Sequence, residues 1–538
     1  MKNLLPALAA ALPAVALSAA LPLLAAAAPS AGRFAKMDRH ALATPKSAET
    51  SLRSLAKYLT RPAKTDLEKA RAIYRWITAN VAYDADAYYS GSYRNQSRRV
   101  EDVLRSRSAV CDGYSGVFER LGGLAGLEVA KISGFAKGAG YRLGQSFAGE
   151  QPNHAWNAVK IGGRWRLLDS TWGAGHVSSD KKAFVREFRD EYFLTPPEQF
   201  ISAHYPEQAQ WQLLKKPLSR REFEERVYVR PEFFSNGLEL ASHRAGRIAA
   251  PERLAVRLKL PAGAALSAGL LRAGKKLDPT LVYVRPAEGG ATVHALFPRP
   301  GAYTLRIFSK RRPRDEVYQW SLDYLVQANK GTSSRFPDFR PPFFSDGLEL
   351  ISHRDGVIET GAEVTVKLAT PADVGLVAEL LRGESKLPRH LTFVQRQGRA
   401  TAVSAHFPRA GSYTLRIFSK KGRSTKEYQW AVDYRVKAAR GMGKRAGFPT
   451  IFTPFLSEGA HLVEPLAGVL PAGKTVRFAL RVPRAEKVAV IVGKKWHFLV
   501  RKGERFEGEV PVAKGEVGVF AKLPGGKGFA GLLGYRGM

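Results

Sequence analysis

The chain has 538 residues, of which 84 are Lys or Arg and 48 are Asp or Glu, so its formal net charge is +36. This length predicts three to five domains of ordinary size, and the single cysteine excludes an internal disulfide bond. The cations are spread over the whole chain without a helix-turn-helix, zinc-finger or RNA-binding motif, so no nucleic acid is expected as a partner.

Residues 1–28 have the pattern of a secretory signal peptide. Lys2 precedes an uncharged run rich in Leu and Ala, which ends in the small residues Ala26-Ala27-Ala28. The run approaches the length of a membrane span, so an N-terminal membrane anchor is the alternative, although the prolines within it weaken a stable helix. The mature protein is therefore expected to be secreted or periplasmic.

The first predicted long helix follows residues 29–60, a mixed and basic stretch that we expect to be a linker. Thr65-Asp66-Leu67-Glu68 has the pattern of a capping box, and apolar residues continue at three- and four-residue spacing up to Val81. Trp76 lies inside this amphipathic helix. We expect it in the core, rather than as a hydrogen-bond donor to a reaction intermediate.

The only cysteine, Cys111, opens a second predicted helix. Tyr114, Val117 and Leu121 follow it at helical spacing, and Gly122-Gly123 can end the helix. A thiol at a helix N-terminus beside an imidazole ionises more readily, and the thiolate is the attacking species in nucleophilic catalysis. A buried, inert thiol is the alternative for a cysteine that stands alone.

The stretch 154–172 predicts a hairpin that joins a histidine to an aspartate. Two strand-like runs flank Gly162-Gly163, a pair suited to a two-residue turn with positive φ at both positions. Counting back from the turn places Asp169 opposite Trp156, so His154 lies diagonal to Asp169 on the same face. Diagonal neighbours have Cβ atoms about 7 to 8 Å apart, a gap that an imidazole and a carboxylate close with one hydrogen bond. Such an aspartate prepares the histidine to act as a general base.

These motifs resemble the transglutaminase-like core that transglutaminases share with papain-like peptidases. The resemblance rests on Cys111 opening a helix, His154-Ala155-Trp156 on a strand and Asp169-Ser170-Thr171-Trp172 after the next strand. It implies an α+β catalytic domain over residues 61–215, in which Cys111 is the nucleophile, His154 the base and Asp169 the residue that orients the base. The flanking segments 72–77, 83–84 and 192–200 are similar to those of the kyphoscoliosis-peptidase branch.

Three features near the predicted catalytic residues leave alternatives open. The segment with Tyr88, Tyr89 and Tyr93 either walls the substrate groove or forms a solvated loop. The glycine-rich segment 138–152 leads to His154 as a lid or as a plain connection. His176 is not accompanied by a cluster of residues with metal-ligand spacing, so no metal and no cofactor is expected.

After residue 214 the sequence repeats with a period of 110 residues. Phe233–Leu240 recurs as Phe343–Leu350, and Gly301–Lys310 recurs as Gly411–Lys420. A third, degenerate copy begins at Phe455. Short alternating runs between Gly and Pro turns are typical of an antiparallel β-sandwich. We expect three immunoglobulin-like domains, at residues 226–329, 336–440 and 446–538.

One motif in the third copy imitates a phosphate-binding loop. Gly468–Thr475 satisfies the spacing of glycines, lysine and threonine, but Val476–Leu480 alternates like a strand where a phosphate loop requires a helix. We therefore expect turn glycines here and no nucleotide.

The expected fold is an α+β papain/transglutaminase-like core followed by three all-β immunoglobulin-like sandwich domains. The expected function is that of an exported cysteine-nucleophile enzyme acting on amide bonds of a peptide or protein through a thioester. Either water (peptidase or amidase) or an amine (acyl transfer) then resolves the thioester. The alternative is a catalytically silent envelope protein that binds or scaffolds through its sandwiches. The positive charge is expected to attract anionic cell-envelope polymers, with solubility alone as the other explanation.

Overall fold

The structure is a computed structural model that describes residues 32–95, 99–138, 140–178, 183–422 and 427–538. Among these, residues up to 140 together with 147–220 form one compact unit, and 141–146 together with 221–538 form a second. The predicted signal peptide, residues 1–28, lies outside the described residues and stays a prediction. Within the described part of the chain, no helix combines the length and apolar character that crossing a membrane requires.

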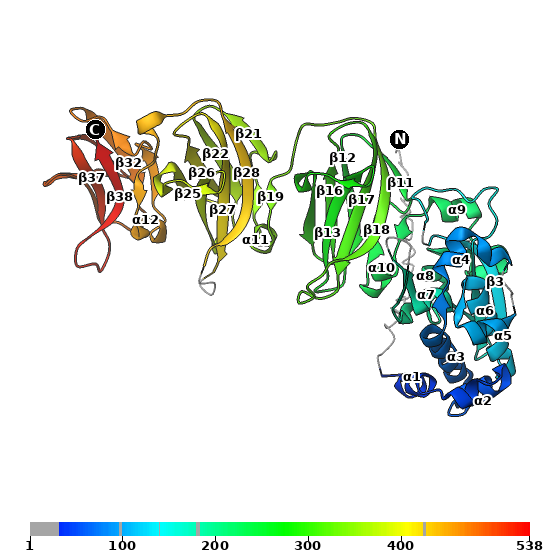
Figure 1. Cartoon of the computed structure of the whole chain (residues 1–538). Coiled ribbons are helices and arrows are strands. Elements are labelled where there is room, and N and C mark those ends of the chain that lie inside the picture. Colours follow the sequence, from blue (N-terminus) through cyan, green and yellow to red (C-terminus); the bar gives the residue numbers. More distant parts are fainter. Residues whose placement is uncertain (1–31, 96–98, 139, 179–182, 423–426) are drawn as a thin grey trace, which may run out of the picture. The chain divides into compact units, whose positions relative to one another are not determined.

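The first unit is built on a four-stranded antiparallel sheet with helices packed on it (Figure 1). Its strand order is β5-β4-β3-β8, with β3 at Val129–Ala136, β4 at His154–Ile161, β5 at Arg164–Leu168 and β8 at His204–Pro206. The helices are α1 (Ala35–Leu42), α2 (Leu52–Thr60), α3 (Asp66–Asn80), α4 (Ala85–Ser90), α5 (Val100–Ser106), α6 (Cys111–Leu124), α7 (Ser170–Ala174) and α8 (Pro197–Phe200). Two small two-stranded sheets pair β1 (Ala82–Tyr83) with β2 (Ser108–Ala109) and β6 (Gly175–Val177) with β7 (Phe184–Arg186).

The prediction that residues 29–60 form a linker is wrong for the part of this segment that the structure describes. Within the described residues, most of this segment is helical, and α1 and α2 bury Met37, Leu55 and Leu59 in the same core as α3 and α6. An ion pair that the sequence pattern did not reveal fixes α1: the buried Arg71 on α3 donates to both carboxylate oxygens of Asp38, at 2.7 and 2.8 Å. The helical core therefore begins well before residue 61.

Two predicted helices are confirmed. Helix α3 begins after a capping box in which Thr65 accepts from the Glu68 amide while the Glu68 carboxylate accepts from the Thr65 amide. Helix α6 begins at Cys111 and buries Tyr114, Val117 and Leu121. Trp76 is fully buried and donates to the Glu49 carboxylate at 3.3 Å, which makes it a core residue as expected.

The second unit contains three β-sandwiches, each made of a four-stranded and a six-stranded sheet. In the first, the order β10-β12-β16-β15 accompanies β11-β18-β17-β13-β14, and β9 pairs with β18. These strands are β9 (Tyr228–Val229), β10 (Glu239–Leu240), β11 (Arg247–Ala250), β12 (Arg253–Lys259), β13 (Ala265–Arg272), β14 (Lys275–Lys276), β15 (Val282–Ala287), β16 (Gly290–Leu296), β17 (Gly301–Lys310) and β18 (Gln319–Ala328).

The second sandwich repeats the first, with the order β20-β22-β26-β25 beside β19-β28-β27-β23-β24, and with β21 on β28. A bulge follows Ile307 in the first copy and Ile417 in the second, 110 positions later, so the sequence repeat is also a repeat of strand register. The strands are β19 (Asp338–Phe339), β20 (Glu349–Leu350), β21 (Val357–Thr360), β22 (Glu363–Ala369), β23 (Val374–Arg382), β24 (Ser385–Lys386), β25 (Thr392–Gln397), β26 (Ala400–His406), β27 (Gly411–Lys421) and β28 (Gln429–Ala438).

The third sandwich keeps the same strand order, with β30-β32-β36-β35 beside β29-β38-β37-β33-β34 and β31 on β38. The phosphate-loop imitation is a turn between β31 and β32 with Gly473 at φ +79°, and a strand follows it as expected. The strands are β29 (Thr450–Ile451), β30 (His461–Glu464), β31 (Val469–Leu470), β32 (Thr475–Arg481), β33 (Lys487–Val492), β34 (Lys495–Phe498), β35 (Val500–Lys502), β36 (Arg505–Pro511), β37 (Gly515–Lys522) and β38 (Phe529–Gly537). Each sandwich has one short helix near its start: α10 (Pro231–Ser235), α11 (Pro341–Ser345) and α12 (Thr453–Ser457).

Candidate active site

The hairpin of β4 and β5 places a histidine beside an aspartate. Gly162 and Gly163 have φ of +55° and +75°, and the ladder runs to Asn157 opposite Leu168. One step further, Asp169 leaves the strand and becomes the N-cap of α7. Nε2 of His154 lies 2.7 Å from Oδ2 of Asp169, so the predicted diagonal contact is formed.

Asp169 is fully buried and is held by backbone groups as well as by the histidine. Its Oδ1 accepts from the amides of Thr171 at 2.8 Å and Trp172 at 3.0 Å, the donors that a helix N-terminus leaves free. The Trp172 ring stacks on His154 with centroids 5.1 Å apart. The carboxylate is therefore fixed in position and screened from solvent.

The thiol of Cys111 meets the other side of the His154 ring. Cys111 is half-buried at the first position of α6, where Val110 makes no side-chain cap bond. Cys111 lies close enough to the His154 ring to contribute to the raised pKa of this histidine, and since Nε2 binds Asp169, Nδ1 is the ring nitrogen left for the sulfur. Cys111, His154 and Asp169 are thus brought together in the order that the sequence predicts.

A buried amide ties the helix with the thiol to the strand with the imidazole. Asn157, three residues after His154 on β4, is fully buried and faces the opposite side of the sheet. Its Nδ2 donates to the Ser115 carbonyl in α6 at 3.0 Å. This contact joins α6 to β4, and the sequence pattern did not predict it.

A second histidine, His204, reaches the same carboxylate. It lies on β8, is fully buried, and has Nε2 3.0 Å from Oδ2 of Asp169. In the sheet, β3 separates the two histidines: Gly134 pairs with His154 on one side, and Ala136 pairs with His204 on the other. Because these two β3 residues are so small, the imidazole rings approach to 5.5 Å between centroids.

His204 was not among the site residues predicted from the sequence. Phe200, the last residue of the flanking segment that resembles the kyphoscoliosis branch, stacks on the His204 ring at 4.0 Å. A histidine beginning the short strand four residues later was the available signal, but nothing in its spacing links it to Asp169.

The charges of the three groups depend on one another. Burial lowers the pKa of His154, but the Asp169 charge and hydrogen bond, with the Cys111 contact, outweigh burial and raise the pKa to about 10. Burial opposes ionisation of Asp169 as well, yet the two histidines hold the pKa of this carboxyl well below its usual range. For His204, burial dominates and lowers the pKa. At neutral pH, His154 is therefore cationic, Asp169 anionic and His204 neutral.

Two tyrosines lie close to the thiol. Burial raises the pKa of Tyr83, and the proximity of Cys111 adds to the shift; the pKa of Tyr88 is raised for the same two reasons. Their rings lie 5.9 Å apart, and Tyr88 also stacks on Tyr93 at 6.0 Å. The predicted tyrosine segment therefore contributes an aromatic surface beside Cys111.

The site has atoms of the kinds that bind metals, but they are engaged with one another. Ligand-type atoms of His154, Asp169 and His204 lie within 4.8 Å of one another. A cation could take all three only after both hydrogen bonds to Asp169 were broken, because Oδ2 accepts from both rings. His176 does not belong to this group; it is half exposed and pairs with Glu187 at 3.3 Å.

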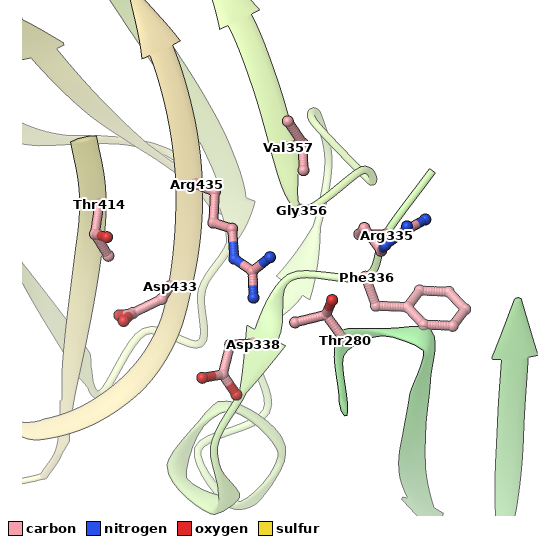
Figure 2. A pocket seen from close by; sticks show the side chains of 9 residues that line it. All are labelled: Thr280, Arg335, Phe336, Asp338, Gly356, Val357, Thr414, Asp433 and Arg435. Carbon is pink, nitrogen blue, oxygen red and sulfur yellow. The ribbon is translucent and has the colours of Figure 1, made fainter. Parts of the chain in front are cut away.

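A cavity of about 90 Å³ in the second unit has a different character. Residues of the first two sandwiches and of the segment joining them line it, and Figure 2 shows Arg435 extending between Asp433 and Thr280. Arg435 pairs with Asp278 at 3.2 Å, and Asp433 binds Arg416 at 2.9 Å. These charged side chains are paired with one another within the protein. We therefore interpret the cavity as part of the contact between the first two sandwiches.

Comparison with known proteins finds relatives for both parts of the chain. A family model described as transglutaminase-like superfamily matches residues 53–170, which include Cys111, His154 and Asp169. A model described as KY-like, immunoglobulin-like domain matches residues 220–337 and 332–449.

Three curated relatives give the extent of the similarity. Kyphoscoliosis peptidase of Mus musculus is 31% identical over 493 residues, which cover 89% of this chain and 73% of that protein. Kyphoscoliosis peptidase of Homo sapiens is 31% identical over 494 residues, with the same two coverages. Hillarin of Drosophila melanogaster is 35% identical over 225 residues, 40% of this chain and 27% of hillarin. With a transglutaminase-like unit followed by KY-like immunoglobulin-like domains, this chain belongs to the kyphoscoliosis peptidase family of the transglutaminase-like superfamily.

Proposed function

We propose that the first unit is a cysteine-dependent enzyme that cleaves amide bonds of a peptide or protein through a thioester on Cys111. One observation carries the proposal: Asp169 binds one nitrogen of the His154 ring, and Cys111, at the start of α6, lies close enough to the same ring to contribute to its raised pKa. An imidazole held in this way can keep the proton of a thiol nucleophile and give that proton to a leaving group. Family membership supports the assignment.

The reaction would proceed in two halves. In the first, the Cys111 sulfur reacts as a thiolate whose proton already resides on Nδ1 of the cationic His154. The sulfur bonds to the amide carbon, leaving the negative charge on the former carbonyl oxygen. The Cys111 amide, at the uncapped start of α6, is a donor for that oxygen. The C–N bond then breaks, the amine leaves with the proton from His154, and the acyl group remains on sulfur as a thioester.

In the second half, an acceptor attacks the thioester carbon and gives its proton to His154, and the C–S bond breaks to restore the thiolate beside the protonated His154. Water as acceptor makes the enzyme a peptidase or amidase, and an amine makes it an acyltransferase. We propose water as the main acceptor, and the names of the mouse and human relatives support this choice.

We further propose that His204 is a positioning residue for this reaction. It adds a second imidazole donor to the same oxygen of Asp169 that holds His154. Together with the two backbone donors on Oδ1, this prevents the carboxylate from rotating. A fixed, anionic Asp169 stabilises the imidazolium that forms on His154.

The nucleophile is tested by alkylation with iodoacetamide at neutral pH, followed by mass spectrometry of the Cys111 peptide. We expect fast labelling in the wild type and slow labelling in His154→Ala. His176→Ala, which changes an exposed histidine outside the site, is the control and should label like the wild type. Equal labelling rates in all three proteins would refute activation of Cys111 by His154.

Turnover is tested with the same proteins and Cys111→Ser on an unfolded protein substrate. New peptide N-termini, or a new carboxylate in place of a side-chain amide, indicate hydrolysis, and incorporation of a fluorescent amine indicates acyl transfer. Both should disappear in Cys111→Ser. Envelope material bound equally by wild type and Cys111→Ser, with no product from either, would instead favour the non-catalytic binding function that the three sandwiches and the net charge of +36 suggest.

Export is part of the proposal and rests on the predicted leader at residues 1–28. N-terminal sequencing of the protein recovered from its native cells should give a first residue near Pro29. A mature protein that keeps Met1 and fractionates with the cytoplasm would exclude export.

A further inference from the structure

The third sandwich carries an exposed group of aromatic side chains. Trp496, Phe498 and Phe452 are 46%, 57% and 43% exposed. Trp496 contacts Phe498 at 6.1 Å, Phe529 at 4.9 Å and Phe520 at 6.3 Å between ring centroids. We call these five residues the aromatic patch.

Strand register places the aromatic patch on one face of the six-stranded sheet. Trp496 pairs with Ile491 and Phe498 with Ala489 on β33, and Phe520 on β37 pairs with the same Ala489. Gly531 lies opposite Phe520, and a Cβ on this glycine would lie 3.5 Å from both Phe452 and Phe520. The small residues between the rings, Ala489 and Gly531, thus leave the face flat and the aromatic patch continuous.

In the first two sandwiches, charged side chains occupy the equivalent face of the six-stranded sheet. In the second, Arg416 binds Asp433 through both carboxylate oxygens and stacks on Trp430 at 3.8 Å, with Arg340 on the same ring at 3.9 Å.

Counting from the strand starts Gly411 and Gly515, Phe520 occupies the position of Arg416. Phe452 precedes α12 as Arg340 precedes α11. The edge strand that bears Trp496 and Phe498 corresponds to Lys275–Lys276 and Ser385–Lys386 in the other copies. In the third sandwich, aromatic rings therefore occupy the positions at which the other two sandwiches carry charged side chains.

The aromatic patch has a basic border. Lys487 and Lys522 pair with each other across β33 and β37, two positions from Ala489 and Phe520 and so on the same face. Lys494 and Lys527 lie in the turns two residues before Trp496 and Phe529, and both are exposed. Among the described residues that the strand register assigns to this face, the acidic residue is Glu516. It lies at the end of β37 away from Phe520 and pairs with Arg536.

We propose that the aromatic patch of the third sandwich docks on an anionic lipid surface. Trp and Phe rings partition into the interface between headgroups and acyl chains, and lysines around them attract anionic headgroups. The flat shape fits a bilayer better than a small ligand, which prefers a concave site. A second copy of the same patch would bring like charges together, and a neutral glycan would meet cations rather than the carboxylates and amides that bind its hydroxyls.

The test uses residues 29–538, the form that the predicted cleavage leaves, so that the apolar leader does not itself bind lipid. Co-sedimentation is measured with vesicles of phosphatidylcholine with and without phosphatidylglycerol. The double variant Trp496→Ser/Phe498→Ser should lower the partition coefficient for the anionic vesicles by about tenfold or more. Lys494→Glu/Lys527→Glu should lower it by a similar factor. Tyr428→Ser, which removes a 39% exposed ring from the second sandwich, is the matched control and should bind like the wild type.

A second measurement separates insertion from electrostatic adsorption. Brominated phosphatidylcholine should quench part of the tryptophan fluorescence of the wild type, and Trp496→Phe should bind equally but lose that quenching. Vesicle binding that is the same in the double Ser variant and in the wild type would overturn the proposal. The proposal would also be overturned if the protein did not bind vesicles but bound an insoluble polysaccharide or another protein through the aromatic patch. Either result would assign the patch to another partner.

Discussion

His204 lies 35 positions after Asp169, yet its Nε2 is 3.0 Å from the Asp169 oxygen that also binds His154. Two imidazoles and two backbone amides thus converge on one buried carboxylate. Since a buried carboxylate without partners would be protonated or displaced, this set of donors is what keeps Asp169 anionic and oriented.

The first prediction concerns His204. His204→Phe removes one donor from Asp169 and should lower kcat by about tenfold to a hundredfold while KM changes little, because His204 does not contact the thiol. His204→Gln keeps an amide donor and should recover part of the loss. Steady-state kinetics of both variants, with thermal unfolding as a check on folding, provide the measurement. Equal kcat losses in Phe and Gln variants that unfold at the wild-type temperature would contradict the positioning role.

The second prediction concerns the contact between α6 and β4. Asn157→Leu removes the side-chain donor that the Ser115 carbonyl has in addition to its bond within α6, and should lower the free energy of unfolding by about 1 kcal/mol or slightly more. It should also lower kcat, because Cys111 is then less well placed against His154. Asn80→Leu is the control: Asn80 donates to the Trp76 carbonyl near the end of α3, where exposure limits the cost to about 0.5 kcal/mol. Urea unfolding and kcat are compared; a similar cost for both variants would argue against a special role for Asn157.

The hairpin was predictable because every step of it is local. Two glycines at the turn and a side-chain period of two fix the register between Ile161 and Arg164, and the register fixes His154 against Asp169. The start of α6 was predictable for a similar reason, since the apolar spacing after Cys111 is helical. The 110-residue period likewise predicted that the second sandwich repeats the strands of the first.

The features that were missed depend on contacts between distant segments. His204 reaches Asp169 only because β8 pairs with the far side of β3, a choice that nothing within 204–206 specifies. The segment 29–60 resembled a linker because its charges are mixed, but Arg71 selects Asp38 as a buried partner and fixes α1 to the core. Exposure of the aromatic patch also depends on sheet pairing, since Trp496 and Phe498 have an ordinary strand alternation.

The third prediction uses two glycines of the first unit. A Cβ at Gly134 would lie 2.3 Å from the Tyr205 carbonyl oxygen and 2.5 Å from the Trp156 ring, on the strand that separates the two histidines. Gly134→Ala should therefore destabilise the unit by about 1 to 3 kcal/mol and lower kcat. Gly123 on α6 has open space around its Cβ position, so Gly123→Ala should stabilise the helix by up to about 1 kcal/mol. Opposite shifts of the unfolding midpoint are expected, and a neutral Gly134→Ala would mean that β3 can move aside without cost.

The fourth prediction concerns pH and follows from the raised pKa of His154. Catalysis requires the proton on His154, so the alkaline limb of kcat/KM should follow loss of that proton. In Asp169→Asn the negative charge that raises the pKa is gone while burial still lowers it, so the alkaline limb should move to lower pH and kcat should fall. Because the folded pKa lies above the unfolded value of about 6.5, the proton contributes stability that is fully present below that pH.

This stability should be lost as the pH rises from there through the folded pKa of about 10. Urea unfolding of the wild type should therefore show a falling free energy over this range, and Asp169→Asn should show a much smaller slope. His176→Ala, which changes an exposed histidine, should keep the wild-type slope. Parallel pH curves for wild type and Asp169→Asn would show that the carboxylate does not hold the proton on His154, and the proposed proton transfers would then lack their base.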